Sequence, residues 1–261
     1  FAIIGFGAST GAIVGPLITS SLIGRFGPFP MMLISAAILL ACLGLSNAIH
    51  LREKDRASRR RAEAVAEQPL GNEGGFKLVL AQRYLFLIGL LTLADNLVNS
   101  NGNYILNATL TDTARAAVAA GTTGGLSIGQ FIGGYMAVID FWQNVLVVLI
   151  QFFLVSRIFR YLGVGRAVFI LPLISFTSYG LFAAAPVLSL IRIAKITENA
   201  TDYSLQNTLR RALFLPTSRE AKYKAKAAID TFFVRGGDLL SAGAVYLGTR
   251  VVQMSVAQFA L

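Results

Sequence analysis

The chain has 261 residues, of which 55% are hydrophobic and only 14% are charged, and its mean hydropathy is +0.64. An ordinary soluble domain carries about 25% charged residues, so this composition excludes that class and indicates a membrane protein. The formal net charge of +10 would also suit nucleic-acid binding, so the distribution of the basic residues has to decide between the two. A single cysteine, Cys42, and a single histidine, His50, exclude an intrachain disulfide and a metal site built from several histidines.

Stretches of about 20 apolar residues, the length that a helix needs to cross a bilayer core of about 30 Å, recur along the chain. They predict an all-α membrane protein with about seven transmembrane helices. Residue 1 is Phe and already lies in an apolar run without a basic segment before it, so we interpret the chain as a fragment rather than as one that begins with a signal peptide. The predicted spans lie near residues 1–23, 31–51, 84–105, 137–156, 165–185, 186–208 and 227–249.

Basic residues alternate between rich and poor connections along this series of spans. The segment 51–83 holds eight Lys and Arg residues, 157–166 holds three and 209–226 holds six. The connections that alternate with these segments along the chain contain few Lys and Arg residues. Cytoplasmic loops carry the excess of Lys and Arg in membrane proteins. The rich segments are therefore predicted to face the cytoplasm, and the basic charge reports topology rather than nucleic-acid binding.

This orientation predicts that residues 59 and 224 are cytoplasmic and that residue 107 lies on the opposite side. A cysteine placed at either cytoplasmic position should resist a membrane-impermeant thiol reagent added outside intact cells, and a cysteine at residue 107 should react. Labelling of residues 59 and 224 with protection of residue 107 would overturn the orientation.

The first span contains "GASTGAIVGP", which places Gly7, Gly11 and Gly15 four residues apart, directly before Pro16. Small residues at that spacing let a neighbouring helix approach closely, and the proline allows a bend. After the second span comes the only long polar stretch, 52–83, which includes "QPLGNEGG". It predicts a cytoplasmic linker between residues 1–51, as the last two helices of an N-terminal bundle, and residues 84–261, as an incomplete C-terminal bundle.

The glycine-rich stretch "GTTGGLSIGQFIGG", residues 121–134, is no nucleotide-binding loop of the Walker type. It lacks the Gly-Lys-Ser/Thr ending, and no predicted strand precedes it. Its glycines Gly125, Gly129 and Gly133 have the spacing of close helix packing instead.

The segment "KITENATDYSLQNT", residues 195–208, places charged side chains inside a predicted span. At about 100° per residue, the polar residues fall on roughly one third of the helix circumference. Intramembrane charges face protein or water rather than lipid, so the stripe either lines a cavity or forms buried ion pairs that fix helix packing. Polar residues of two other spans favour the cavity, which gives the candidate binding residues Lys195, Glu198, Asn199, Asp202, Gln206, Asp95, Asn99, Arg235 and Asp238.

The long stretch from Lys195 to Ala242, "KITENATDYSLQNTLRRALFLPTSREAKYKAKAAIDTFFVRGGDLLSA", resembles the bacterial and plastid ATP/ADP carrier family of nucleotide transporters. The segments "FLVSRIF" and "GVGRAVFILP", within residues 153–172, are similar to the junction of the eighth and ninth helices of that family, and the first span to the fifth helix. The resemblance implies a twelve-helix fold of the major facilitator type, of which helices one to four and twelve are outside this chain. It also implies ATP/ADP exchange across a bacterial inner membrane.

The charged residues of the predicted spans do not determine which solute is transported. Arg192, Lys195 and Arg235 do not outnumber Asp95, Glu198, Asp202 and Asp238, so the visible groups offer no cationic surplus for a nucleotide. Either the missing helices supply it, or the acids carry protons as the coupling ion and the cargo is a less anionic solute.

The expected function is therefore alternating-access transport of a nucleotide or a related anionic solute through the lipid bilayer. The alternative is a non-transporting membrane sensor or scaffold that retains the transporter fold. An enzyme is not expected, because the sequence offers no nucleophile with a base, no metal cluster and no cofactor loop, and we expect no cofactor, no metal and no nucleic-acid partner.

Overall fold

A computed structural model describes residues 2–61, 74–185 and 187–260, which form helices and, within these ranges, no β-strand. Several helices contain a turn of π-helix. These turns, and one 3₁₀ segment near the end of the chain, carry the label η. The elements are α1 (Ala2–Phe26), α2 (Pro28–Arg61), α3 (Gly75–Ala81), α4 (Arg83–Ala119), α5 (Ile128–Leu149), η2 (Ile150–Leu154), α6 (Val155–Tyr161), α7 (Gly163–Ala167), α8 (Ile170–Ala184), α9 (Leu188–Thr201), η3 (Asp202–Gln206), α10 (Asn207–Leu213), η4 (Ala221–Ala225), α11 (Lys226–Ala228), η5 (Ile229–Phe233), α12 (Val234–Leu247), η6 (Gly248–Val252) and η7 (Val256–Ala260).

Three helical stretches in the described part of the chain are long and apolar enough to cross a membrane, Pro28–Ile49, Ile128–Tyr161 and Gly163–Ala184. A fourth is added if α3 and α4, which meet at an angle of 105°, count as one span. Within the described residues, the predicted spans at 186–208 and 227–249 are helical from Leu188 and Lys226 onward but contain several charged side chains, and the first predicted span is helical from Ala2. The all-helical class is confirmed with several membrane-length helices, and the count of seven spans stays a prediction.

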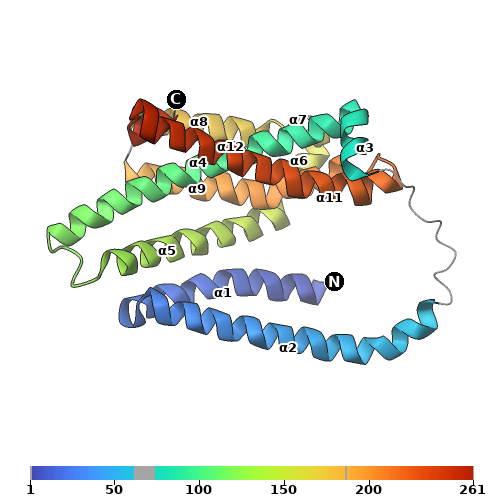
Figure 1. Cartoon of the computed structure of the whole chain (residues 1–261), viewed down its shortest axis with the longest axis horizontal. Helices are drawn as coiled ribbons and strands as arrows, with labels where there is room; N and C mark the ends of the chain where they lie inside the picture. The colour runs from blue at the N-terminus through green and yellow to red at the C-terminus, as the bar shows by residue number, and fades with distance from the viewer. Residues whose placement is uncertain (1, 62–73, 186, 261) are drawn as a thin grey trace.

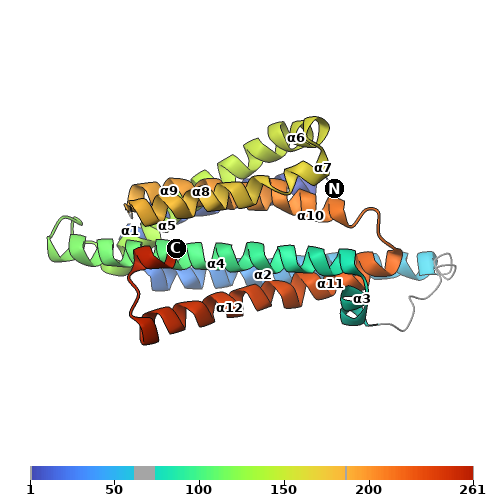
Figure 2. The same ribbon diagram turned by 90° about the horizontal axis from the view of Figure 1, so that it is seen from above.

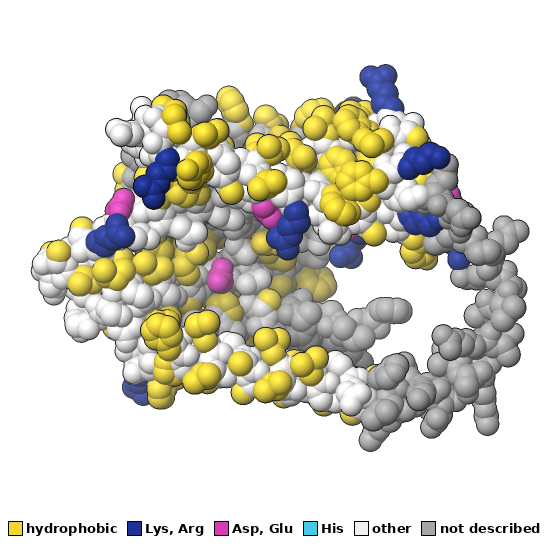
Figure 3. Space-filling model, in the orientation of Figure 1, with side chains coloured by type: hydrophobic (Ala, Val, Ile, Leu, Met, Phe, Trp, Pro, Cys, Tyr) yellow, Lys and Arg dark blue, Asp and Glu magenta, His cyan; other side chains and the backbone are white. Residues whose placement is uncertain are grey.

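The long helices run roughly parallel, as Figure 1 shows, with α5 between the α1–α2 hairpin and the remaining helices. The view from above in Figure 2 places α4 between α12 on one side and α8 with α9 on the other. Hydrophobic side chains are spread along the helices on the face seen in Figure 3, with few charged ones among them. An apolar outer surface of this kind suits contact with lipid.

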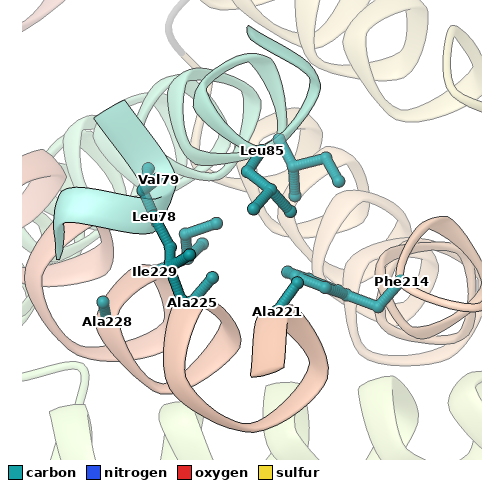
Figure 4. Packing of buried hydrophobic residues seen from close by; sticks show 9 residues of the cluster. Leu78, Val79, Leu85, Phe214, Ala221, Ala225, Ala228 and Ile229 are labelled. Atoms are coloured by element: carbon teal, nitrogen blue, oxygen red, sulfur yellow. The ribbon is translucent and has the colours of Figure 1, made fainter. Parts of the chain in front are cut away.

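The predicted linker is more helical than expected. Helix α2 continues through the basic run to Arg61, because Arg, Glu and Ala are good helix formers, and residues 75–81 fold as α3. Residues 62–73 of the predicted linker lie outside the described residues. Helix α3 turns across the end of α4 and packs in a cluster with η4 and η5 (Figure 4). The buried members are Leu78, Val79, Leu85, Ile88, Phe214, Ala221, Ala225, Ala228 and Ile229.

The predicted 106–136 connection is also mostly helical, which corrects the sequence interpretation. Helix α4 reaches Ala119, and α5 begins after Ser127, whose hydroxyl accepts a hydrogen bond from the Gln130 amide in a capping box. Residue 107 therefore lies on α4, and the exposed Thr122 in the short loop is the better outside position for cysteine labelling.

The two glycine patterns differ in what surrounds them. A Cβ added to Gly11 or Gly15 would meet no described atom within 4 Å, so the predicted close packing is not seen at these positions. On α5, in contrast, a Cβ at Gly129 would lie 3.7 Å from Pro28, and one at Gly133 would collide with Ile23. Gly125 precedes the helix in a left-handed conformation with φ of 85° and belongs to the loop.

Candidate functional site

Helix α9 lies at the centre of the C-terminal half and packs against α4, α5 and α8. Its outward face carries Ile193 and Thr197, which are exposed, whereas Lys195 and Glu198 point into the protein. The side chains of this pair are 0% and 2% exposed. A helix surrounded by three neighbours can bury charged groups on one face, provided that the neighbours supply partners.

Lys195 and Glu198 form an ion pair with 3.0 Å between Nζ and Oε2. The ammonium also donates to Oδ1 of Asn99 at 3.2 Å and to its backbone oxygen at 3.4 Å. The second carboxylate oxygen of Glu198 accepts a hydrogen bond from the Ser175 hydroxyl at 2.9 Å. The three donors of the ammonium thus have acceptors on α9 and α4, and the carboxylate has partners on α9 and α8, which is what a buried charge pair requires.

Gly102 makes room for the lysine. A Cβ at this position on α4 would lie 3.0 Å from Nζ of Lys195 and 3.1 Å from the hydroxyl of Tyr179. That hydroxyl donates to the backbone oxygen of Val98 and joins α8 to α4 at the same level. The absence of a side chain on Gly102 therefore lets a long cationic side chain and a tyrosine lie against the α4 backbone.

Two further carboxylates continue the network toward α10. Asp202 accepts a hydrogen bond from Arg210, with 3.3 Å between Nη2 and Oδ1. Asp95 on α4 accepts one from the side-chain amide of Gln206 at 2.6 Å. Asp202 and Gln206 are the first and last residues of the π-helical turn η3. Such turns occur often at functional sites, because they change the direction of side chains within an otherwise regular helix.

A cavity of about 340 Å³ opens beside this network between α4, α8 and α9. Its wall is largely apolar and carries three carboxylates, Asp95, Glu198 and Asp202, together with the amide of Asn99 and the hydroxyl-bearing Ser175 and Tyr179. Lys195 is not among its lining residues and is screened by Asn99 and Glu198. The full lining is Leu91, Ala94, Asp95, Val98, Asn99, Leu171, Pro172, Ser175, Phe176, Tyr179, Glu198 and Asp202.

The structure brings six of the nine predicted residues together, Asp95, Asn99, Lys195, Glu198, Asp202 and Gln206. Asn199 lies on the other side of α9, where its side-chain amide donates to Gln143 of α5 at 2.9 Å. Positions three and four after Lys195 are about 100° apart on the helix, so Glu198 faces α8 while Asn199 faces α5.

Arg235 and Asp238 form a separate group on the seam between α12 and α4. They are paired at 3.1 Å, and Asp238 also accepts hydrogen bonds from Asn96 at 2.6 Å and Ser100 at 2.7 Å. The arginine side chain is 81% exposed. Their assignment to one site with Lys195 is therefore not supported by direct contact.

Sequence reasoning missed four participants, Ser175, Tyr179, Gly102 and Arg210. Ser175 and Tyr179 are four residues apart on α8, which is a helical spacing that could have identified them within their apolar run. Arg210 belongs to the basic segment 209–226 that predicts topology, but it also lies two helical turns after Asp202 and reaches back to it.

Comparison with protein-family models, with curated protein sequences and with solved structures finds no match to this chain. The resemblance to nucleotide carriers therefore stays a prediction from the quoted segments.

Proposed function

We propose that this chain belongs to a multi-pass transporter that moves a nucleotide or a related anionic solute by alternating access across a bacterial inner membrane. The observation that carries the proposal is the fully buried pair of Lys195 and Glu198 beside a cavity in a helical, membrane-type protein. The resemblance of residues 195–242 to ATP/ADP carriers supports the substrate class. The predicted mechanism is rocking of two bundles joined by the 52–83 segment.

The energetic cost of the network supports a functional role. A charged side chain at the centre of a bilayer costs about 2.5–3.5 kcal/mol on insertion scales, and such residues mark ion and substrate pathways by default. Here the charged groups connect three different helices, since α4, α8 and α9 each contribute partners. A network of this kind changes its hydrogen bonds when helices move relative to one another, which is what a transport cycle requires.

The charge balance favours coupling to protons. Lys195 and Arg210 supply two positive charges, against three carboxylates on Asp95, Glu198 and Asp202, so the network has a formal charge of −1. An anion would be repelled unless a carboxylate takes up a proton as it binds. A nucleotide exchanger would need further cations from outside this network.

A membrane sensor or scaffold that retains the fold is the second candidate. It is favoured by one observation, that Lys195 has its hydrogen bonds satisfied by Asn99 and Glu198 and lies outside the cavity lining. A residue held in this way suits a structural pair as well as a binding group.

Transport can be tested with the protein reconstituted in proteoliposomes and a panel of labelled nucleotides and other anions. We expect uptake of at least one of them, and Lys195→Gln should reduce it by about tenfold or more because a charge-assisted hydrogen bond is lost. Ile193→Val, on the exposed face of α9, is the matched control and should leave uptake unchanged. Absence of uptake across the panel would favour the sensor or scaffold.

A further inference from the structure

A second, smaller cavity of about 270 Å³ lies between α4, α10 and the α11–η5–α12 segment. Its lining differs in character from that of the first cavity, because it combines three cations with one carboxylate. The lining residues are Thr92, Asn207, Arg210, Arg211, Phe214, Lys226, Asp230 and Val234.

The three cations differ in how they are neutralised. Lys226 is hydrogen-bonded to Asp230, one turn further along the chain, and both side chains are partly exposed. Arg210 reaches out of this cavity to Asp202. Arg211 has no acidic partner within 4.0 Å in the part of the chain that the structure describes, so the cavity has an uncompensated guanidinium.

We propose that this cavity binds a tetrahedral oxyanion of the phosphate or sulfate type, either free or as the headgroup of an anionic lipid. Arginine presents planar pairs of N–H donors that match such an anion, and Lys226 on α11 adds a further positive charge to the lining, next to its partner Asp230. Asn207 also lines the cavity, and its side-chain amide adds two N–H donors. The inference does not require transport, so failure of uptake would leave it standing.

Arg210 connects the two cavities. It lines the second cavity, and its present partner Asp202 lines the first one. An oxyanion in the second cavity competes with Asp202 for the same guanidinium. Anion binding is therefore coupled to the charge state and freedom of Asp202, and the coupling is reciprocal.

The test uses the purified protein in nanodiscs of neutral lipid, with inorganic phosphate and sulfate titrated at constant ionic strength and binding followed by calorimetry. We expect saturable binding, weakened about tenfold or more by Arg211→Gln and by Lys226→Gln, since each change removes a charge-assisted contact. Arg157→Gln, an equal charge change at an exposed position on α6, is the control and should bind as the unmodified protein does. No saturable binding, or equal binding by all three variants, would overturn the site.

The coupling between the two cavities through Arg210 can be measured separately. Asp202→Asn releases Arg210 from its ion pair and should tighten phosphate binding several-fold, opposite in sign to the Arg211 and Lys226 variants. Unchanged or weakened binding in Asp202→Asn would overturn the link between the cavities. Repeating the titration in nanodiscs that contain an anionic phospholipid separates the two sources, because competition by the lipid identifies the headgroup and undiminished binding identifies the free ion.

Discussion

Neutralising Glu198 while keeping its shape, as in Glu198→Gln, should lower the free energy of unfolding by about 3–5 kcal/mol. The reason is that the Lys195 ammonium, whose side chain is 0% exposed, would lose its anionic partner and keep only neutral oxygens, those of Asn99 and of the new glutamine, as hydrogen-bond acceptors. Removing one partner of a buried ion pair leaves an uncompensated charge in a medium of low dielectric constant. Thermal or denaturant unfolding of the purified protein in detergent measures the effect.

Asp112→Asn is a matched control for this prediction. Asp112 and Arg115 form an ion pair with the same spacing of three residues, at 3.6 Å, but their side chains are 69% and 68% exposed. Loss of an exposed pair of this kind changes stability little. Equal stability of Glu198→Gln and Asp112→Asn would show that the buried pair is not held as the structure describes it.

The double change Lys195→Met with Glu198→Leu separates a structural role from a functional one. Apolar residues of similar volume can replace a buried ion pair without loss of stability, so the double variant should recover most of what Glu198→Gln loses. Recovery of stability without recovery of uptake would assign the pair to transport. Recovery of both would assign it to packing.

The polar face of α9 could be predicted from sequence because helical periodicity alone places Lys195, Glu198 and Asp202 on one side. The helix that each of these side chains meets could not be predicted in that way. Asp95 and Asn96 are adjacent in sequence and about 100° apart on α4, so Asp95 turns to Gln206 while Asn96 turns to Asp238 on α12. The predicted binding residues therefore form two separate clusters, one beside Lys195 and one at Asp238, because α4 packs against different helices on its two sides.

The helix boundaries were less predictable than the polar face. Hydropathy ends a span where the apolar residues end, but backbone hydrogen bonding continues as long as the residues favour a helix. Helix α4 therefore continues through residues 106–119, where polar side chains alternate with alanine and leucine, and α2 continues to Arg61. Of the two glycine patterns, the one on α5 lies against a neighbouring helix, and the spacing of glycines alone does not distinguish it from the pattern on α1.

Gly237→Ala should destabilise the protein by about 1–3 kcal/mol through overpacking of the seam between α12 and α4. A Cβ at this position would lie 2.7 Å from the backbone oxygen of Leu93 and 2.9 Å from the backbone nitrogen of Leu97. Backbone atoms in a helix cannot move aside as a flexible side chain can, so the two helices have to separate. The separation would also lengthen the hydrogen bonds from Asn96 and Ser100 to the neighbouring Asp238.

Gly243→Ala on the same helix is the control, because a Cβ there would meet no described atom within 4 Å. Alanine is a better helix former than glycine by about 0.8–1.0 kcal/mol, so this variant should be as stable as the unmodified protein or slightly more stable. The two substitutions are chemically identical, and we expect their unfolding free energies in detergent to differ by about 1–4 kcal/mol. Equal values would mean that α12 does not lie against α4 at Gly237, and the partners assigned to Asp238 would then be wrong as well.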